Sequence, residues 1–153
     1  MKKKLHAVLL FWCAVSLAAC EYKPEPIRFG TDDCAHCKMR ISDGRFGAEM
    51  ITSKGRVLKF DAIECMAGYY GEHVQSPSDI HSLWTIDFNK PQILVRAEPA
   101  FFLHSVSLPS PMGMFLSSFE NRADLELVME KHPGDVVDWN GVLGLVAARR
   151  AGM

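Results

Sequence analysis

Two thiols, an imidazole and a thioether lie within six residues near the start of the chain, at Cys34, His36, Cys37 and Met39. A Cys-x-x-Cys pair brings two sulfur atoms onto one turn, where they can form a disulfide or share a metal ion. These residue types suit a redox-active dithiol, a structural zinc site or a site for a softer metal. The rest of the sequence has to distinguish among the three.

The first two interpretations lack part of their usual context. A thioredoxin-like motif follows a strand and opens a helix, whereas this pair follows a proline-containing stretch, and no helix start is evident at Cys34. Structural zinc usually takes four N or S ligands from two paired corners, and here Cys65 is the one further thiol. A Cys3His site with a distant histidine stays open, as does an inert Cys34–Cys37 disulfide.

The soft-metal interpretation is favoured by the methionines, because thiolate and thioether ligands together select Cu(I). In an extended segment Cys37 and Met39 would lie on one side, and the same period of two would align Met112 and Met114 around Gly113. Cys65 is expected to be a small core residue on a helix. The sequence therefore predicts a Cu(I) site that draws on the following residues: Cys34, His36, Cys37, Met39, Met112 and Met114.

The N-terminus has the features of a bacterial lipoprotein signal. Three lysines at 2–4 precede an apolar run that ends in Leu-Ala-Ala-Cys at Cys20, which is typical of a cleaved signal peptide over residues 1–19. The apolar run is too short to span a membrane, and we expect a lipid on Cys20 that anchors the protein in the periplasm. Glu21 follows Cys20, where Asp is the inner-membrane retention signal, so the outer membrane is slightly favoured.

The mature chain would comprise residues 20–153. The full chain has a net charge of −1, and removal of the three lysines at 2–4 would leave the mature chain with −4. This charge predicts no nucleic-acid binding. Three cysteines would remain after removal of Cys13 and lipidation of Cys20, and an odd number in a secreted protein favours a reactive or metal-binding thiol. We find no Ser-His-Asp set and no phosphate-binding glycine loop, and expect a binding protein rather than an enzyme.

The hydrophobic pattern predicts an α+β fold after a proline-containing tether at 20–31. Asp61 is expected to cap a helix that ends at Gly71, with Glu64 as its capping-box partner. The domain at 32–153 would divide into halves at about 32–90 and 91–153, each a strand–strand–helix–strand unit. The elements expected are strands at 46–52, 56–60, 83–88, 92–97 and 100–106, an extended 113–119, helices at 62–70 and 122–131, and a last short strand or helical turn within 136–146.

Four motifs in this order resemble the NosL family. They are the Leu-Ala-Ala-Cys20 ending, Cys34-x-x-Cys37-x-Met39, Phe60-Asp61-x-x-x-Cys65-Met66 and Pro111-Met112-Gly113. The resemblance covers most of the mature chain. The sequence departs from the family at Lys38, where the family usually has glycine.

This resemblance implies a copper-binding periplasmic lipoprotein that acts as an accessory protein for nitrous oxide reductase. It further implies Cu(I) as the cargo, an ABC-transporter-linked maturation complex as the partner, and two fused units similar to the organomercurial lyase fold. Cys34, Cys37, Met39 and Met112 match the family motifs, and Met114 is an additional local candidate. The alternative from the residues alone is a periplasmic thiol–disulfide oxidoreductase that uses Cys34 and Cys37.

Overall fold

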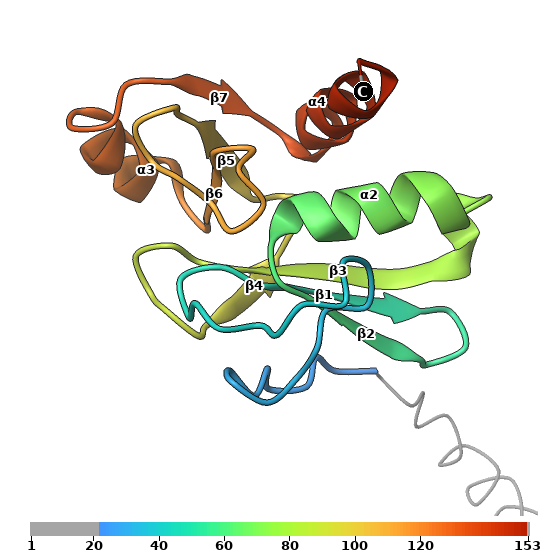
Figure 1. Ribbon diagram of the computed structural model, residues 1–153. Coiled ribbons are helices and arrows are strands. Elements are labelled where there is room, and N and C mark those ends of the chain that lie inside the picture. Colours follow the sequence, from blue (N-terminus) through green and yellow to red (C-terminus); the bar gives the residue numbers. More distant parts are fainter. Residues whose placement is uncertain (1–21, 153) are drawn as a thin grey trace, which may run out of the picture.

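The structure is a computed structural model that describes residues 22–152 (Figure 1). The predicted signal peptide and the lipid-attachment residue Cys20 therefore lie outside the described residues. The elements, in chain order, are β1 (Ala48–Thr52), β2 (Val57–Phe60), α2 (Ile63–His73), the 3₁₀ turn η2 (Pro77–Asp79), β3 (Ile80–Ile86), β4 (Leu94–Arg96), β5 (Phe101–His104), β6 (Leu116–Phe119), α3 (Arg122–Met129), β7 (Asp135–Val137) and α4 (Trp139–Ala151).

The strands form two antiparallel sheets with matching connectivity. The first has the order β2-β1-β3-β4 and the second has the order β6-β5-β7. In each, the first strand of the unit pairs with the second on one side and, on the other, with the strand that follows the helix. This repeat confirms the predicted pair of strand–strand–helix–strand units. β4 and α4 are additions, and β4 pairs with β3 of the first unit.

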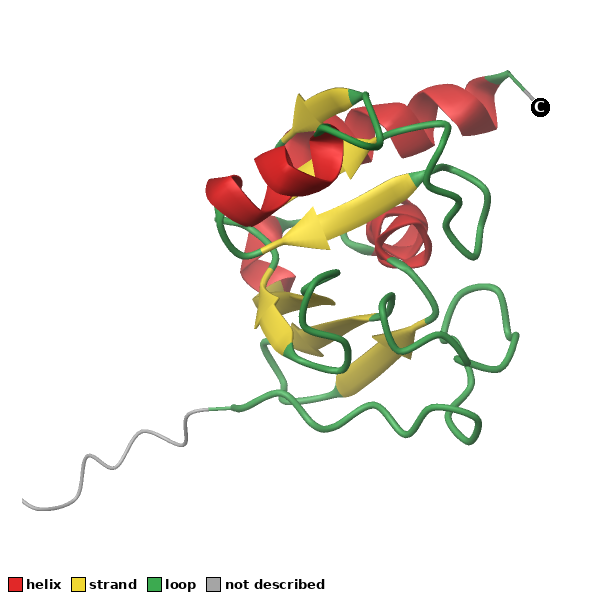
Figure 2. Ribbon diagram, turned by 90° about the vertical axis from the view of Figure 1, so that its left-hand side faces the viewer, coloured by secondary structure: helices red, strands yellow, loops and turns green. Residues whose placement is uncertain are grey.

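Helix α2 lies at the centre of the molecule, between the first sheet and the second unit (Figure 2). It contacts β1 and β2 on one side and β6 and α4 on the other. Both halves therefore contribute to one hydrophobic core, which includes Met50, Phe60, Met66, Phe102, Leu116 and Val142. A hydrogen bond of 2.7 Å between the hydroxyls of Thr85 and Ser118 also joins the two units.

The ends of α2 differ from the prediction. Its N-cap is Ala62, without a side-chain capping bond, and one oxygen of the buried Asp61 carboxylate has no hydrogen-bond partner. The helix also continues past Gly71 to His73. Tertiary packing against two layers extends it beyond the glycine at which the local signal would end it.

Two later elements also differ. Within 136–146, the short strand expected at Val136 and Val137 is present as β7, but the residues after it form the 13-residue helix α4. Asp138 caps it by accepting the Gly141 N–H at 2.8 Å, and its buried Trp139, Val142 and Val146 have helical spacing. The extended segment predicted at 113–119 narrows to β6, because residues 113 and 115 have positive φ and form a turn.

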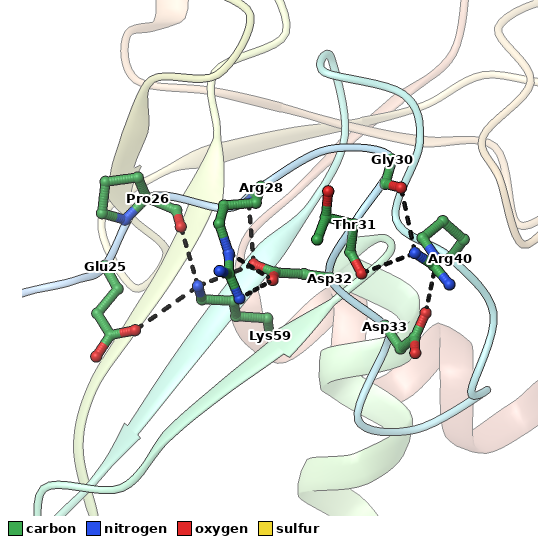
Figure 3. A network of polar contacts seen from close by, with 9 residues as sticks. All are labelled: Glu25, Pro26, Arg28, Gly30, Thr31, Asp32, Asp33, Arg40 and Lys59. Carbon is green, nitrogen blue, oxygen red and sulfur yellow. Dashed lines mark hydrogen bonds and ion pairs between the residues drawn. The ribbon is translucent and has the colours of Figure 1, made fainter.

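The segment predicted as a tether contacts the first sheet at several points (Figure 3). Ile27 is buried, and the Glu25 N–H donates to Glu49 at 2.9 Å. The Lys59 ammonium donates to the Pro26 carbonyl and to the Asp32 carboxylate, both at 2.9 Å. Residues 22–32 are thus held on the domain by charged hydrogen bonds.

Within residues 22–152, every helix is too short or too polar to cross a membrane.

Candidate metal centre

A tight loop before the first sheet positions Cys34 and Cys37. The Cys34 N–H donates to the Met39 carbonyl at 2.8 Å, and the Lys38 N–H donates to the Cys34 carbonyl at 3.1 Å. A further bond of 2.7 Å from the Ala35 N–H to the Lys59 carbonyl ties the loop to β2. Lys38 closes the turn with a φ of 67°, a left-handed conformation that glycine adopts without steric cost. The turn thus explains why glycine suits this position.

Helix α2 supplies the third thiol. Cys65 is the third residue of α2, and its sulfur lies within 4.8 Å of the sulfurs of Cys34 and Cys37, as those two do of each other. None of the three forms a disulfide; Cys34 and Cys65 are buried, and Cys37 is half-buried. Cys37 is therefore the most accessible of the three thiols. Sequence reasoning had placed Cys65 in the core, and the odd number of mature cysteines was the signal for a third ligand.

Hydrogen bonds concentrate the negative charge of this cluster on Cys34. The Cys65 thiol donates to the Cys34 sulfur, and this bond, together with donation from nearby backbone N–H groups, lowers the pKa of Cys34 to about 5. Burial raises the pKa of Cys37. The hydrogen bond to Cys34, and then burial, raises the pKa of Cys65. The lowered pKa favours a thiolate at Cys34, and a bound metal would displace the protons that remain on the other thiols.

A pocket of about 280 Å³ adjoins the cluster at Cys65. Cys65 and His36 line it together with the thioethers of Met112 and Met114. Met112 and Met114 do not alternate as they would in a strand, since the backbone turns at Gly113 and Phe115. The turn nevertheless brings both side chains to one pocket beside the cysteine cluster.

The loop that carries these methionines is fixed at its base and at its tip. At the base, the Ser110 hydroxyl donates to the buried Glu64 carboxylate and accepts the Phe115 N–H at 2.9 Å. At the tip, the Arg149 guanidinium of α4 donates to the Gly113 carbonyl at 3.0 Å. The other oxygen of Glu64 has no hydrogen-bond partner, and burial raises the pKa of Glu64.

His36 lies against α2 at a position where the helix has no side chain. A Cβ on Gly68 would lie 2.8 Å from the His36 Nε2. On the other side of the ring, Nδ1 is 3.6 Å from the Glu72 carboxylate, which also pairs with Arg150 of α4 at 2.5 Å. Gly68 therefore leaves the space that the imidazole occupies beside the pocket.

Met39 lines a different depression from the other predicted residues. Its side chain is 48% exposed and lines a separate depression with Asp61 and Pro111. An extended segment would place the side chains of Cys37 and Met39 on the same side. The left-handed turn at Lys38 breaks this alternation between them.

The sequence model of the NosL family matches residues 27–144. The chain belongs to the NosL family. No curated protein matches the sequence. Among solved structures, the fold of this NosL-family protein is similar to the crystal structure of the copper chaperone NosL from Shewanella denitrificans, with a TM-score of 0.67 and 21% identity. The alignment covers 78% of this chain and 95% of that chain.

Proposed function

We propose that this NosL-family protein is a periplasmic, lipid-anchored Cu(I) carrier that supplies copper for the maturation of nitrous oxide reductase. The observation that carries the proposal is the group of three sulfurs within 4.8 Å of one another, next to a pocket with two thioethers. Cysteine and methionine sulfur are the ligands that select Cu(I). Family membership and the fold shared with a copper chaperone support an accessory role rather than an enzymatic one.

In this proposal Cys34, Cys37 and Cys65 hold the ion, and Met112, Met114 and His36 provide a route for its exchange. The Cys34 thiolate offers one negative charge to a monovalent cation before any proton has to leave. Weaker neutral ligands next to a thiolate cluster let an ion leave stepwise, by exchanging one ligand at a time. Met39, exposed on the same loop, is then available to a partner or to an incoming ion.

A Cu(I) titration of the reduced apo-protein against a chelator of known affinity tests this function. We expect one tightly bound ion, and a loss of at least about tenfold in affinity for Cys65→Ser, since even residues behind the ligands are worth 10–100-fold. Met112→Leu should weaken binding more than Met129→Leu, the matched control in α3. Micromolar or weaker binding by the wild type, or unchanged binding by Cys65→Ser and Cys37→Ser, would refute the proposal.

Anchoring and delivery are tested separately. Mass spectrometry of the membrane-extracted protein should show diacylglycerol on Cys20. A strain that lacks the protein should contain nitrous oxide reductase with less copper, restored by the wild type but not by Cys65→Ser. A reductase with full copper content in that strain would remove the delivery target while leaving copper binding in place.

The low pKa of Cys34 also fits a thiol–disulfide oxidoreductase. A redox-active thiolate must, however, reach the disulfide of its substrate, and Cys34 is only 1% exposed. Insulin reduction by metal-free protein at a rate that Cys34→Ser abolishes would favour the oxidoreductase over the carrier.

A further inference from the structure

The described chain begins at a defined place on the domain. The ring of Tyr22 covers Gly55 in the turn between β1 and β2, where a Cβ would lie 2.5 Å from it. The same ring packs edge-on against His81 at the start of β3, with 5.4 Å between ring centroids. The chain therefore leaves the domain beside the β1–β2 turn (Figure 1).

The proposed lipid-bearing residue lies two positions before Tyr22. An extended chain spans about 3.5 Å per residue, so the Cα of Cys20 can lie no more than about 7 Å from that of Tyr22. Because residues 22–32 are bound to the first sheet (Figure 3), they provide no slack. The β1–β2 turn must then stay close to the membrane surface.

This end of the domain carries cations without carboxylate partners. Lys23, Lys54 and Arg56 are exposed. None of the three takes part in an ion pair within residues 22–152, so none has a carboxylate oxygen within 4.0 Å there. Of the nearby acids, Glu25 is paired with Lys59, and Asp79 accepts the Ser76 N–H. The positive charge at this end contrasts with the net charge of −4 expected for the mature chain.

We propose that the surface formed by Tyr22, Lys23, Lys54 and Arg56 lies against anionic lipid headgroups and fixes the orientation of the domain on the membrane. This inference rests on the proposed anchoring at Cys20. Lysine and arginine side chains are attracted to anionic lipids near the surface, and aromatic residues such as tyrosine favour the interface. The occupant is a lipid surface rather than an acidic protein, because the chain brings this surface to the membrane.

The metal centre is linked to this surface by one hollow. Arg56 lines a pocket of about 500 Å³ together with Lys38 and His36 of the cysteine loop. With the basic surface on the membrane, this hollow would bring the cysteine loop near the headgroups.

Hydrogen exchange of the lipidated protein in vesicles tests the orientation. We expect the amides of residues 52–57 to exchange at least about fivefold more slowly with vesicles that contain phosphatidylglycerol than with vesicles of phosphatidylcholine alone. About fivefold corresponds to the attraction of one lysine or arginine to an anionic membrane surface. The difference should disappear at high salt and in the double variant Lys54→Glu/Arg56→Glu. Lys131→Glu is the matched control and should retain the difference, because this exposed lysine follows α3, an element far from the β1–β2 turn (Figure 1).

A second measurement removes the dependence on lipidation. The unlipidated Cys20→Ala chain should sediment with phosphatidylglycerol vesicles at low salt, and the double variant should not. Equal exchange in both lipids together with no sedimentation would overturn the inference. The inference would also be overturned if the double variant bound vesicles like the wild type but transferred copper to its recipient more slowly. The surface would then bind an acidic protein rather than lipid. The copper titration does not depend on Lys54 or Arg56, so the two proposals can fail independently.

Discussion

Lys38 offers a test of the strained turn that holds the cysteine pair. Its φ of 67° places a side chain in the left-handed region, and its ammonium donates to the Ala35 carbonyl at 2.7 Å. Lys38→Ala and Lys38→Gly both remove that hydrogen bond. The difference between these two variants therefore isolates the cost of a Cβ at this backbone conformation.

The expected difference combines two opposing terms. A Cβ in the left-handed region costs about 1–2 kcal/mol, and alanine pays this cost in the folded state while glycine does not. Glycine instead loses about 0.4–1 kcal/mol through its greater freedom in the unfolded chain. We therefore expect Lys38→Gly to be more stable than Lys38→Ala by about 0.5–1 kcal/mol.

Urea unfolding of reduced, metal-free protein at pH 7 measures the difference. Lys54 provides the matched control, because it is an exposed turn lysine without positive φ, and there the alanine variant should be the more stable. If Lys38→Ala were as stable as Lys38→Gly, the turn would not impose a left-handed conformation on this residue.

Three further predictions concern buried charge, packing and the methionine loop. Burial raises the pKa of Glu49 from 4.5 to about 7, so the folded state holds the proton more tightly and stability should fall as the pH rises between these values. Glu49→Gln should remove up to about 3 kcal/mol of that fall, measured by urea unfolding at pH 5 and pH 8; an unchanged pH dependence would contradict the shift. Gly68→Ala should destabilise the wild type, because the new Cβ displaces His36. In the His36→Ala variant the same change should stabilise the protein by up to about 1 kcal/mol through helix propensity. Additive effects on the free energy of unfolding in this double-mutant cycle would mean that the two residues do not compete for space. Arg149→Ala should speed Cu(I) transfer to a chelator by about two- to tenfold, the worth of one net hydrogen bond, while Arg122→Ala should not; equal rates in stopped-flow transfer would show that the bond to the Gly113 carbonyl does not retain the loop.

The repeated strand–strand–helix–strand order could be predicted from the sequence because each unit is marked locally. Alternating apolar residues, a Lys-Gly turn and helix stops are signals that act over a few residues. The ends of α2 and the whole of α4 were less accessible, since contacts between α2 and α4 decide them. Such contacts join residues far apart in the sequence and override local propensity.

The candidate site shows the same division. Cys34 and Cys37 could be recognised from their spacing, but Cys65 could not be placed beside them, because its position depends on how α2 packs on the loop. Met39 depends on backbone geometry in the same way. Its nearness to Cys37 in sequence predicts a shared ligand set, whereas the left-handed turn at Lys38 is followed by a Met39 that lines a different depression.

The contact between α4 and the methionine loop has a kinetic consequence. Arg149 lies beyond residue 144, where the match to the family ends, and it donates a hydrogen bond to the loop tip. The cysteines would then set how tightly the ion is held, whereas the last turn of α4 would set how long it stays. Relatives with different C-termini could thus differ in the residence time of copper while sharing one affinity.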